Sequence, residues 1–165
     1  MLKKFFVFII ATTLISVGMV QAEERQTDKQ VTSGTQMKQG ELKWYTNYKE
    51  AEAVAKKENL PMLLFFTGSD WCGWCKKIDK EIFEQKNFAS AVGEKFVFLK
   101  LDFPMNSQLP RDLAEQNAML KQKYGVTGFP TIVILDAQGN FLAETGYRPG
   151  GGKEYADYLM SLIQK

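Results

Sequence analysis

Residues 71–75 read Trp-Cys-Gly-Trp-Cys and hold the only two cysteines of the 165-residue chain. Before them, the apolar run at residues 62–66 reads as a short buried strand, which Gly-Ser-Asp at residues 68–70 then breaks. After them, Ile78 and Ile82 recur at helical spacing among charged residues. The cysteines are therefore predicted to lie at a junction between a strand and a helix.

Such a junction favours thiol chemistry. The start of a helix leaves backbone N–H groups unpaired and carries the positive end of the helix dipole, and both stabilise a thiolate. Cys72, the first of the pair, is therefore the predicted nucleophile. Cys75 lies one turn deeper on the same face, where it can attack a mixed disulfide and release the partner. The redox-active disulfide Cys72–Cys75 would then serve in place of any cofactor.

Three other interpretations of the pair are less favoured. A structural disulfide that closes so short a loop removes little entropy from the unfolded chain. A zinc site needs about four ligands, and the chain has no histidine and no second cysteine pair, so we expect no metal. Inert core cysteines fit poorly with the polar flanks, Ser69 and Asp70 before the pair and Lys76 and Lys77 after it.

The first 22 residues have the pattern of a secretory signal peptide. Lys3 and Lys4 precede an apolar stretch at residues 5–20, and small residues near Ala22 offer a cleavage point. An uncleaved membrane anchor is the alternative, although the apolar stretch is shorter than the roughly 20 residues that span a bilayer comfortably. We therefore expect a periplasmic or secreted protein, released by cleavage near Ala22.

Residues 23–41 are predicted to form a flexible polar tether, because residues 23–40 contain no aromatic side chain and only Val31 and Met37 as larger apolar groups. Residues 42–165 are long enough for one domain with a real core. Without Lys3 and Lys4, 19 of the 21 basic residues remain against 19 acidic ones. This balance gives no electrostatic reason to expect a nucleic acid partner.

Strands are predicted to alternate with helices along this domain, and a final hairpin indicates a mixed α/β sheet. One helix is capped by Thr46 or Asn47 and runs to about Asn59, and another follows the cysteines and continues through residues 87–92. The other helices are expected over residues 113–124 and 153–164. The strands are expected over residues 44–45, 62–66, 95–102, 130–135 and 141–144.

Two motifs resemble the signatures of the thioredoxin superfamily. Residues 71–76, Trp-Cys-Gly-Trp-Cys-Lys, are similar to its W-C-x-x-C-K site, and residues 126–131, Val-Thr-Gly-Phe-Pro-Thr, are similar to its second signature. The resemblance covers residues 42–165 and implies a thioredoxin fold, a central mixed β-sheet flanked by helices. It also implies that Pro130 is cis and packs beside the cysteines. The expected catalytic residues are Cys72 and Cys75, and the expected substrate-binding residues are Trp71, Gly73, Trp74, Phe129 and Pro130. For Trp74, a mere cover over the dithiol is an equal alternative.

The chain also departs from thioredoxins. Phe66 stands where they carry a buried acid, so the proton must take another route, through water, Asp70 or a lysine. Gly73 and Trp74 supply no imidazolium to stabilise a thiolate. Residues 103–116 form a longer connection than in small thioredoxins, which resembles the exported thioredoxin-like disulfide reductases of the DsbH type.

We therefore predict an exported thiol–disulfide oxidoreductase that reduces disulfides of other exported proteins. The resemblance implies a membrane thiol-electron donor that reduces the Cys72–Cys75 disulfide again. We expect a monomer. The short tether argues against an isomerase, because it cannot build the dimerisation domain of dimeric isomerases. The alternatives are an oxidase or isomerase, a cytochrome-maturation reductase, and a redox-inert binding module that only keeps the fold.

Overall fold

The structure is a computed structural model that describes residues 41–164. The predicted signal peptide and nearly all of the predicted tether lie outside the described residues. Within residues 41–164, no helix is both long enough and apolar enough to cross a bilayer.

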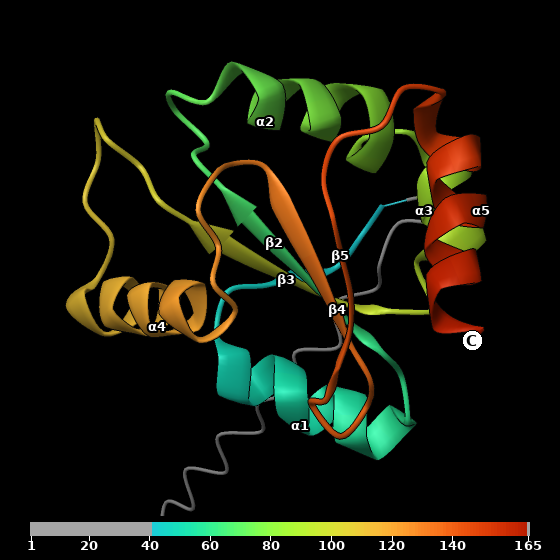
Figure 1. Cartoon of the computed structure of the whole chain (residues 1–165), viewed down its shortest axis with the longest axis horizontal. Coiled ribbons are helices and arrows are strands. Elements are labelled where there is room, and N and C mark those ends of the chain that lie inside the picture. The colour runs from blue at the N-terminus through green and yellow to red at the C-terminus, as the bar shows by residue number, and fades with distance from the viewer. Residues whose placement is uncertain (1–40, 165) are drawn as a thin grey trace, which may run out of the picture. The chain divides into compact units, whose positions relative to one another are not determined.

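A five-stranded sheet forms the centre of the described domain (Figure 1). Its strands lie in the order β1-β3-β2-β4-β5. Strands β1 and β2 both pair in parallel with β3, whereas β4 pairs antiparallel with β2, and β5 antiparallel with β4. The predicted mixed sheet is thus confirmed. The strands are β1 Trp44–Tyr45, β2 Met62–Thr67, β3 Val97–Asp102, β4 Thr131–Leu135 and β5 Phe141–Thr145.

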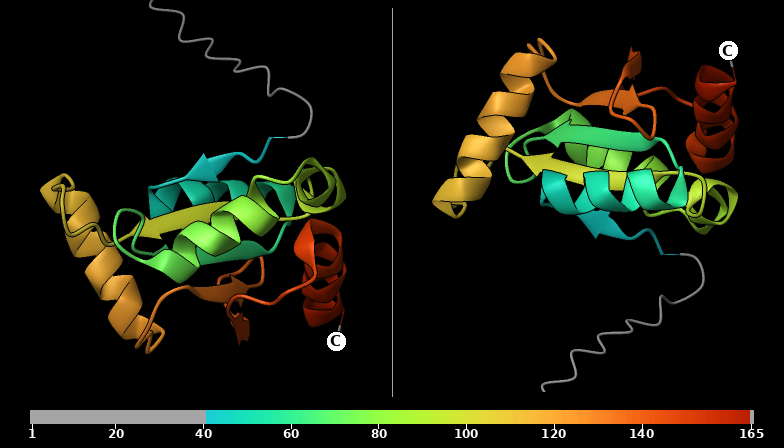
Figure 2. Two further views of the ribbon diagram at one scale, coloured as in Figure 1. Left: turned by 90° about the horizontal axis from the view of Figure 1, so that it is seen from above. Right: turned by 90° about the horizontal axis from the view of Figure 1, so that it is seen from below.

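Helices cover both faces of the sheet (Figure 2). Alternate residues of β2 point to opposite faces. Leu63 and Phe65 join one core cluster with residues of α2, η1, α3 and α5, and Leu64 and Phe66 join another with residues of α1 and α4. The helical segments are α1 Tyr48–Glu58, α2 Gly73–Ile78, the π-helical η1 Asp79–Phe83, α3 Lys86–Val92, α4 Arg111–Lys123 and α5 Gly151–Ile163.

Two predicted helix starts are shifted by local backbone chemistry. Helix α4 begins directly after Pro110, two residues before the predicted start, because the fixed φ of proline suits the entry to a helix. Helix α5 begins at Gly151, also earlier than predicted, after Gly150 at φ 123°, a conformation that residues with a side chain rarely adopt. Of the two predicted caps of α1, Asn47 is the one whose side chain accepts a hydrogen bond from Glu50 N.

The sequence predicted one helix from the cysteines through residue 92, but the structure divides this segment into α2, η1 and α3. Helix α2 passes into η1, where the N–H of Glu84 donates to the carbonyl of Asp79, and the helical path stops before Gln85. The wider turn of a π-helix lets the adjacent residues Ile82 and Phe83 both lie in the core, at 0 % and 5 % exposure. Core packing thus overrides the regular helical period at this point.

Candidate active site

The disulfide between Cys72 and Cys75 spans the first turn of α2. Cys72 is the N-cap of the helix, and the N–H of Cys75 donates to Cys72 Sγ at 3.1 Å. The N–H of Cys72 donates to the carbonyl of Gly68, which fixes the turn that leads out of β2. Cys72 is 6 % exposed and Cys75 is fully buried, so only the outer residue offers any surface to another disulfide.

Trp71 joins the cysteine turn to the second motif. Its indole Nε1–H donates to the carbonyl oxygen of Phe103 at 2.8 Å, and its ring meets that of Phe129 edge to face, with centroids 5.8 Å apart. The peptide bond from Phe129 to Pro130 is cis. The structure thus brings the two sequence motifs, 71–76 and 126–131, into contact through the rings of Trp71 and Phe129.

Trp74, the second residue of α2, is 57 % exposed. Its ring lies against Tyr147, with centroids 5.4 Å apart, and Lys77 Nζ lies 4.9 Å and 5.0 Å from the two ring centres. The hydroxyl of Tyr147 donates to Glu81 Oε2, and this hydrogen bond raises the pKa of Tyr147. Trp74 is therefore braced on one side while most of its surface stays open.

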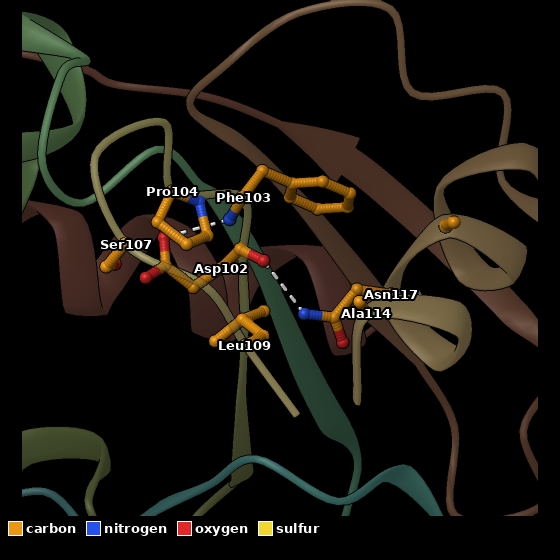
Figure 3. Close-up of a pocket in the computed structure, with 8 residues that line it drawn as sticks. Asp102, Phe103, Pro104, Ser107, Leu109, Ala114 and Asn117 are labelled. Atoms are coloured by element: carbon orange, nitrogen blue, oxygen red, sulfur yellow. Dashed lines mark hydrogen bonds between the residues drawn. The ribbon is translucent and has the colours of Figure 1, made fainter. Parts of the chain in front are cut away.

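Asp102, at the end of β3, ties the cysteine turn to the connection that follows β3. Its carboxylate accepts hydrogen bonds from the backbone N–H of Ser69 at 2.9 Å, the hydroxyl of Ser69 at 2.6 Å and the N–H of Phe103 at 2.9 Å. Its carbonyl oxygen accepts from the side-chain amide of Asn117 on α4 (Figure 3). The position of Ser69, and with it the turn before the cysteines, thus depends on β3.

A cavity of about 220 Å³ lies between this connection and α4 (Figure 3). Asp102 and Asn117 supply polar groups to its wall, and most of the remaining lining is apolar. Its apolar lining includes Phe103, Pro104, Leu109 and Ala114. The cavity shares Phe103 with the site, since the carbonyl of Phe103 accepts the indole N–H of Trp71. The cysteines do not line the cavity.

Asp70 is turned toward the same connection. Its carboxylate accepts hydrogen bonds from the backbone N–H groups of Met105, at 3.0 Å, and Asn106, at 2.6 Å. These two bonds hold the pKa of Asp70 below its ordinary value, which makes the carboxylate a weak proton acceptor. The predicted proton route through Asp70 therefore has little support. The ammonium of Lys76 binds the backbone carbonyl of Asp70.

Sequence reasoning missed two residues of this site, Tyr147 and Asp102. Tyr147 reaches Glu81 across 66 positions of sequence, and Asp102 reaches Ser69 across 33. Nothing near either residue in the sequence marks it as part of the site. Phe66 is buried in the core cluster on the α1 side of the sheet, where its ring stacks on that of Phe103.

Comparison with known proteins adds a family and relatives. Residues 48–159 match the family model of the thioredoxin-like domain. The chain is 33 % identical to the disulfide bond reductase DsbH of Chlamydia pneumoniae, over 94 % of this chain and 93 % of that protein. It is 31 % identical to the thioredoxin-related protein DsbJ of Chlamydia pneumoniae, over 86 % of this chain but only 40 % of that protein.

A solved structure of a DsbH oxidoreductase is also similar to this one. The two are 39 % identical in sequence and superpose with a TM-score of 0.72, over 75 % of this chain and 85 % of the other. This agreement extends the likeness from sequence to the three-dimensional arrangement of the domain.

Proposed function

The chain belongs to the thioredoxin-like domain family, and from this premise we propose that it is an exported reductase of protein disulfides. It is a thiol–disulfide oxidoreductase, like the relatives that it matches over nearly its whole length. The direction of the reaction, its location outside the cytoplasm and its partners are the parts of the proposal that need experiments.

The main support for this proposal is that Cys72 is slightly exposed and Cys75 is fully buried. In the reduced protein, the thiolate of Cys72 attacks a substrate disulfide, because it is the outer residue and caps the start of α2. One substrate sulfur leaves as a thiolate, and the other stays bonded to Cys72. The buried Cys75 then attacks Cys72 Sγ, which restores the intramolecular disulfide and releases the second substrate thiolate.

The surface around Cys72 supports a protein substrate. Trp71 and Trp74 are both exposed, and Phe129 lies against Trp71. Exposed aromatic side chains bind polypeptide chains through large apolar area with little loss of side-chain freedom. We propose that these rings hold the segments on either side of the substrate cysteine, with Gly73 and Pro130 leaving room for the backbone.

The charges near the dithiol support reduction over oxidation. A strong oxidant needs a specially stabilised thiolate, and thus positive charge close to the sulfur. This chain has no histidine, Lys76 binds the carbonyl of Asp70, and Lys77 lies over the rings of Trp74 and Tyr147. Each turnover leaves the pair oxidised, so a reductase outside the cytoplasm requires a thiol donor that carries electrons across the membrane.

The test is a trapping experiment in cells, paired with an insulin reduction assay. Cys75→Ser should accumulate mixed disulfides between Cys72 and exported proteins, and Cys72→Ser, the matched control, should accumulate none. The wild-type protein should accelerate the reduction of insulin by dithiothreitol. A Cys75→Ser variant that traps nothing would favour the redox-inert binding module, and a protein that oxidises reduced substrates faster than it reduces insulin would favour the oxidase.

A further inference from the structure

The connection between β3 and α4 is fastened to the turn that presents Cys72. Strands β2 and β3 are parallel, so the segment that leads to the cysteines and the connection leave the sheet at the same edge (Figure 1). Three consecutive residues before Cys72, which are Ser69, Asp70 and Trp71, form hydrogen bonds to residues 102–106. The start of the connection therefore lies beside the nucleophile.

Met105 is an apolar side chain that this connection holds out to solvent. It is 73 % exposed, more than Trp71 or Trp74. Its neighbours Phe103 and Pro104 line the cavity against α4, whereas Met105 does not (Figure 3). The connection thus has an inner apolar side that packs toward α4 and one large apolar side chain that is left outside.

The exposure of Met105 is not the result of a loose backbone. Its N–H donates to Asp70 Oδ1 at 3.0 Å, and the N–H of Asn106 donates to Asp70 Oδ2 at 2.6 Å. Hydrogen bonds to an ionised acceptor are roughly twice as strong as neutral ones. The ammonium of Lys76 binds the carbonyl of Asp70 and so ties the same residue to α2. Met105 is therefore presented by a backbone that the cysteine turn itself holds.

A side chain of this kind suits the binding of another apolar group. Removing apolar surface from water is favourable, and a backbone that is already ordered loses little entropy on binding. The unbranched thioether of methionine adapts to partners of different shape, as on surfaces that bind many sequences. Met105 extends the proposed substrate surface of Trp71 and Phe129 on the Trp71 side, whereas Tyr147 lies against Trp74.

A substrate chain bound at Cys72 comes within reach of Met105. Asp70 and Cys72 are two residues apart in sequence, so their Cα atoms lie within about 7 Å of each other. The Asp70 carboxylate covers the remaining distance to the backbone of Met105. Since an extended chain advances about 3.3 Å per residue, residues within about four positions of a substrate cysteine can reach Met105.

We propose that Met105 is a specificity-determining residue that binds a large apolar side chain of the substrate polypeptide near its reactive cysteine, an inference that rests on the proposed function. Disulfides flanked by residues such as leucine are then reduced in preference to disulfides flanked only by small polar residues. Met105 contributes to binding and takes no part in the exchange of the sulfur bonds.

The test is a competition for Cys72 in the Cys75→Ser variant, in which the mixed disulfide persists. The protein, at limiting concentration, receives equal excesses of two symmetric peptide disulfides that carry either leucine or serine on both sides of the cysteine. Mass spectrometry measures the two adducts of Cys72 early in the reaction. The leucine adduct should exceed the serine adduct at least about fivefold, and Met105→Gln should lower this ratio at least about threefold.

Met119 on α4 provides the matched control. It is 65 % exposed and lines a pocket with Tyr48 and Lys49 of α1, away from the cysteine turn. Met119→Gln should leave the ratio of the adducts within about twofold, as expected of a surface substitution outside the binding surface. Met105→Leu, which keeps an apolar side chain at the same place, should preserve the preference for the leucine peptide.

The ratio separates substrate binding from damage to the site. A ratio close to one in the parent protein, or a ratio that Met105→Gln leaves within about twofold, overturns the inference. So does an equal loss of both adducts at an unchanged ratio, because Met105 would then act on the cysteine turn and not on the substrate.

The two hypotheses fail in different ways. Where the wild-type protein does not reduce insulin and Cys75→Ser traps no exported proteins in cells, the proposed function fails whatever the peptide ratio is. Where reduction and trapping occur but Met105→Gln keeps the wild-type preference, only the role of Met105 fails.

Discussion

Replacing Gly68 by alanine should dislodge Trp71 and loosen the wall of the site beside Cys72. A Cβ at this position would lie 2.4 Å from Trp71 Cε2 and 2.6 Å from Trp71 Nε1, whereas ordinary contact begins at about 3.4 Å. The indole must therefore retreat by about 1 Å, or the Gly68 backbone must shift. Since the carbonyl of Gly68 accepts the N–H of Cys72, a backbone shift would disturb the nucleophile instead.

The magnitude follows from the contacts that Trp71 makes. Its hydrogen bond to Phe103 measures 2.8 Å, and a retreat of about 1 Å that lengthens this bond by the same amount leaves a separation that is no longer a hydrogen bond. The bond contributes about 0.5 to 1.5 kcal/mol. The edge-to-face contact with Phe129 contributes a similar amount, so the two contacts together stabilise the position of the Trp71 side chain by about 1 to 3 kcal/mol.

Hydrogen exchange of the indole N–H groups, followed by NMR, measures this loss directly. The chain has three tryptophans, and only the Trp71 signal should exchange faster in Gly68→Ala, by about fivefold or more. The KM for insulin should rise with it. Gly128→Ala is the control for the indole signal, because its added Cβ would meet nothing within 4 Å. An unchanged exchange rate of the Trp71 indole in Gly68→Ala would refute the predicted displacement.

Three further predictions concern the redox pair, a charge and the core. The Cys72–Cys75 pair, equilibrated with glutathione, should have a potential between about −270 and −210 mV, and a value above about −160 mV would support the oxidase. Asp70→Asn should lower the melting temperature at neutral pH, because the pKa of Asp70 is held below its ordinary value of 3.8. The deficit should vanish as the pH falls through that lowered pKa, and a deficit that does not depend on pH would contradict the assigned hydrogen bonds. In urea denaturation, Leu159→Ala should lose about 2 to 5 kcal/mol, since its side chain is fully buried, and the exposed Leu142→Ala should lose far less.

The order of strands and helices was predictable because apolar runs and glycine or proline breaks agree along the chain. The run at residues 62–66 became β2 Met62–Thr67 with one residue added. The π-helical turn was not predictable, because Ile78 and Ile82 fit an ordinary helix as well. What decides it is the burial of Phe83, whose ring contacts Trp44 and Phe65 from distant segments and Phe88 from the following helix.

The candidate site was predictable where its residues form contiguous motifs. Cys72, Cys75 and Pro130 stand in such motifs, whereas Asp102 and Tyr147 act through partners that are remote in sequence. Asp79 shows the difficulty best. Read along the chain, it is one acid among Lys76, Lys77 and Lys80, the pattern of a solvated helix face, and only its pairing with Lys100 of β3 reveals that it lies partly inside.

The stability of Asp79→Asn can show whether burial or the ion pair with Lys100 dominates at this acid. The pKa of Asp79 is raised above its ordinary value of 3.8, so the fold favours the protonated form. That contribution to stability is fully present below about pH 3.8 and is lost as the pH rises through the raised pKa. Asparagine resembles the protonated form at every pH, and Lys100 keeps contact with water when its partner is removed. The variant should therefore melt at or above the wild-type temperature at neutral pH, with the difference falling toward zero in acid. A dominant ion pair predicts the opposite sign, a loss of stability at neutral pH, so thermal unfolding at about pH 4 and about pH 7 decides between the two.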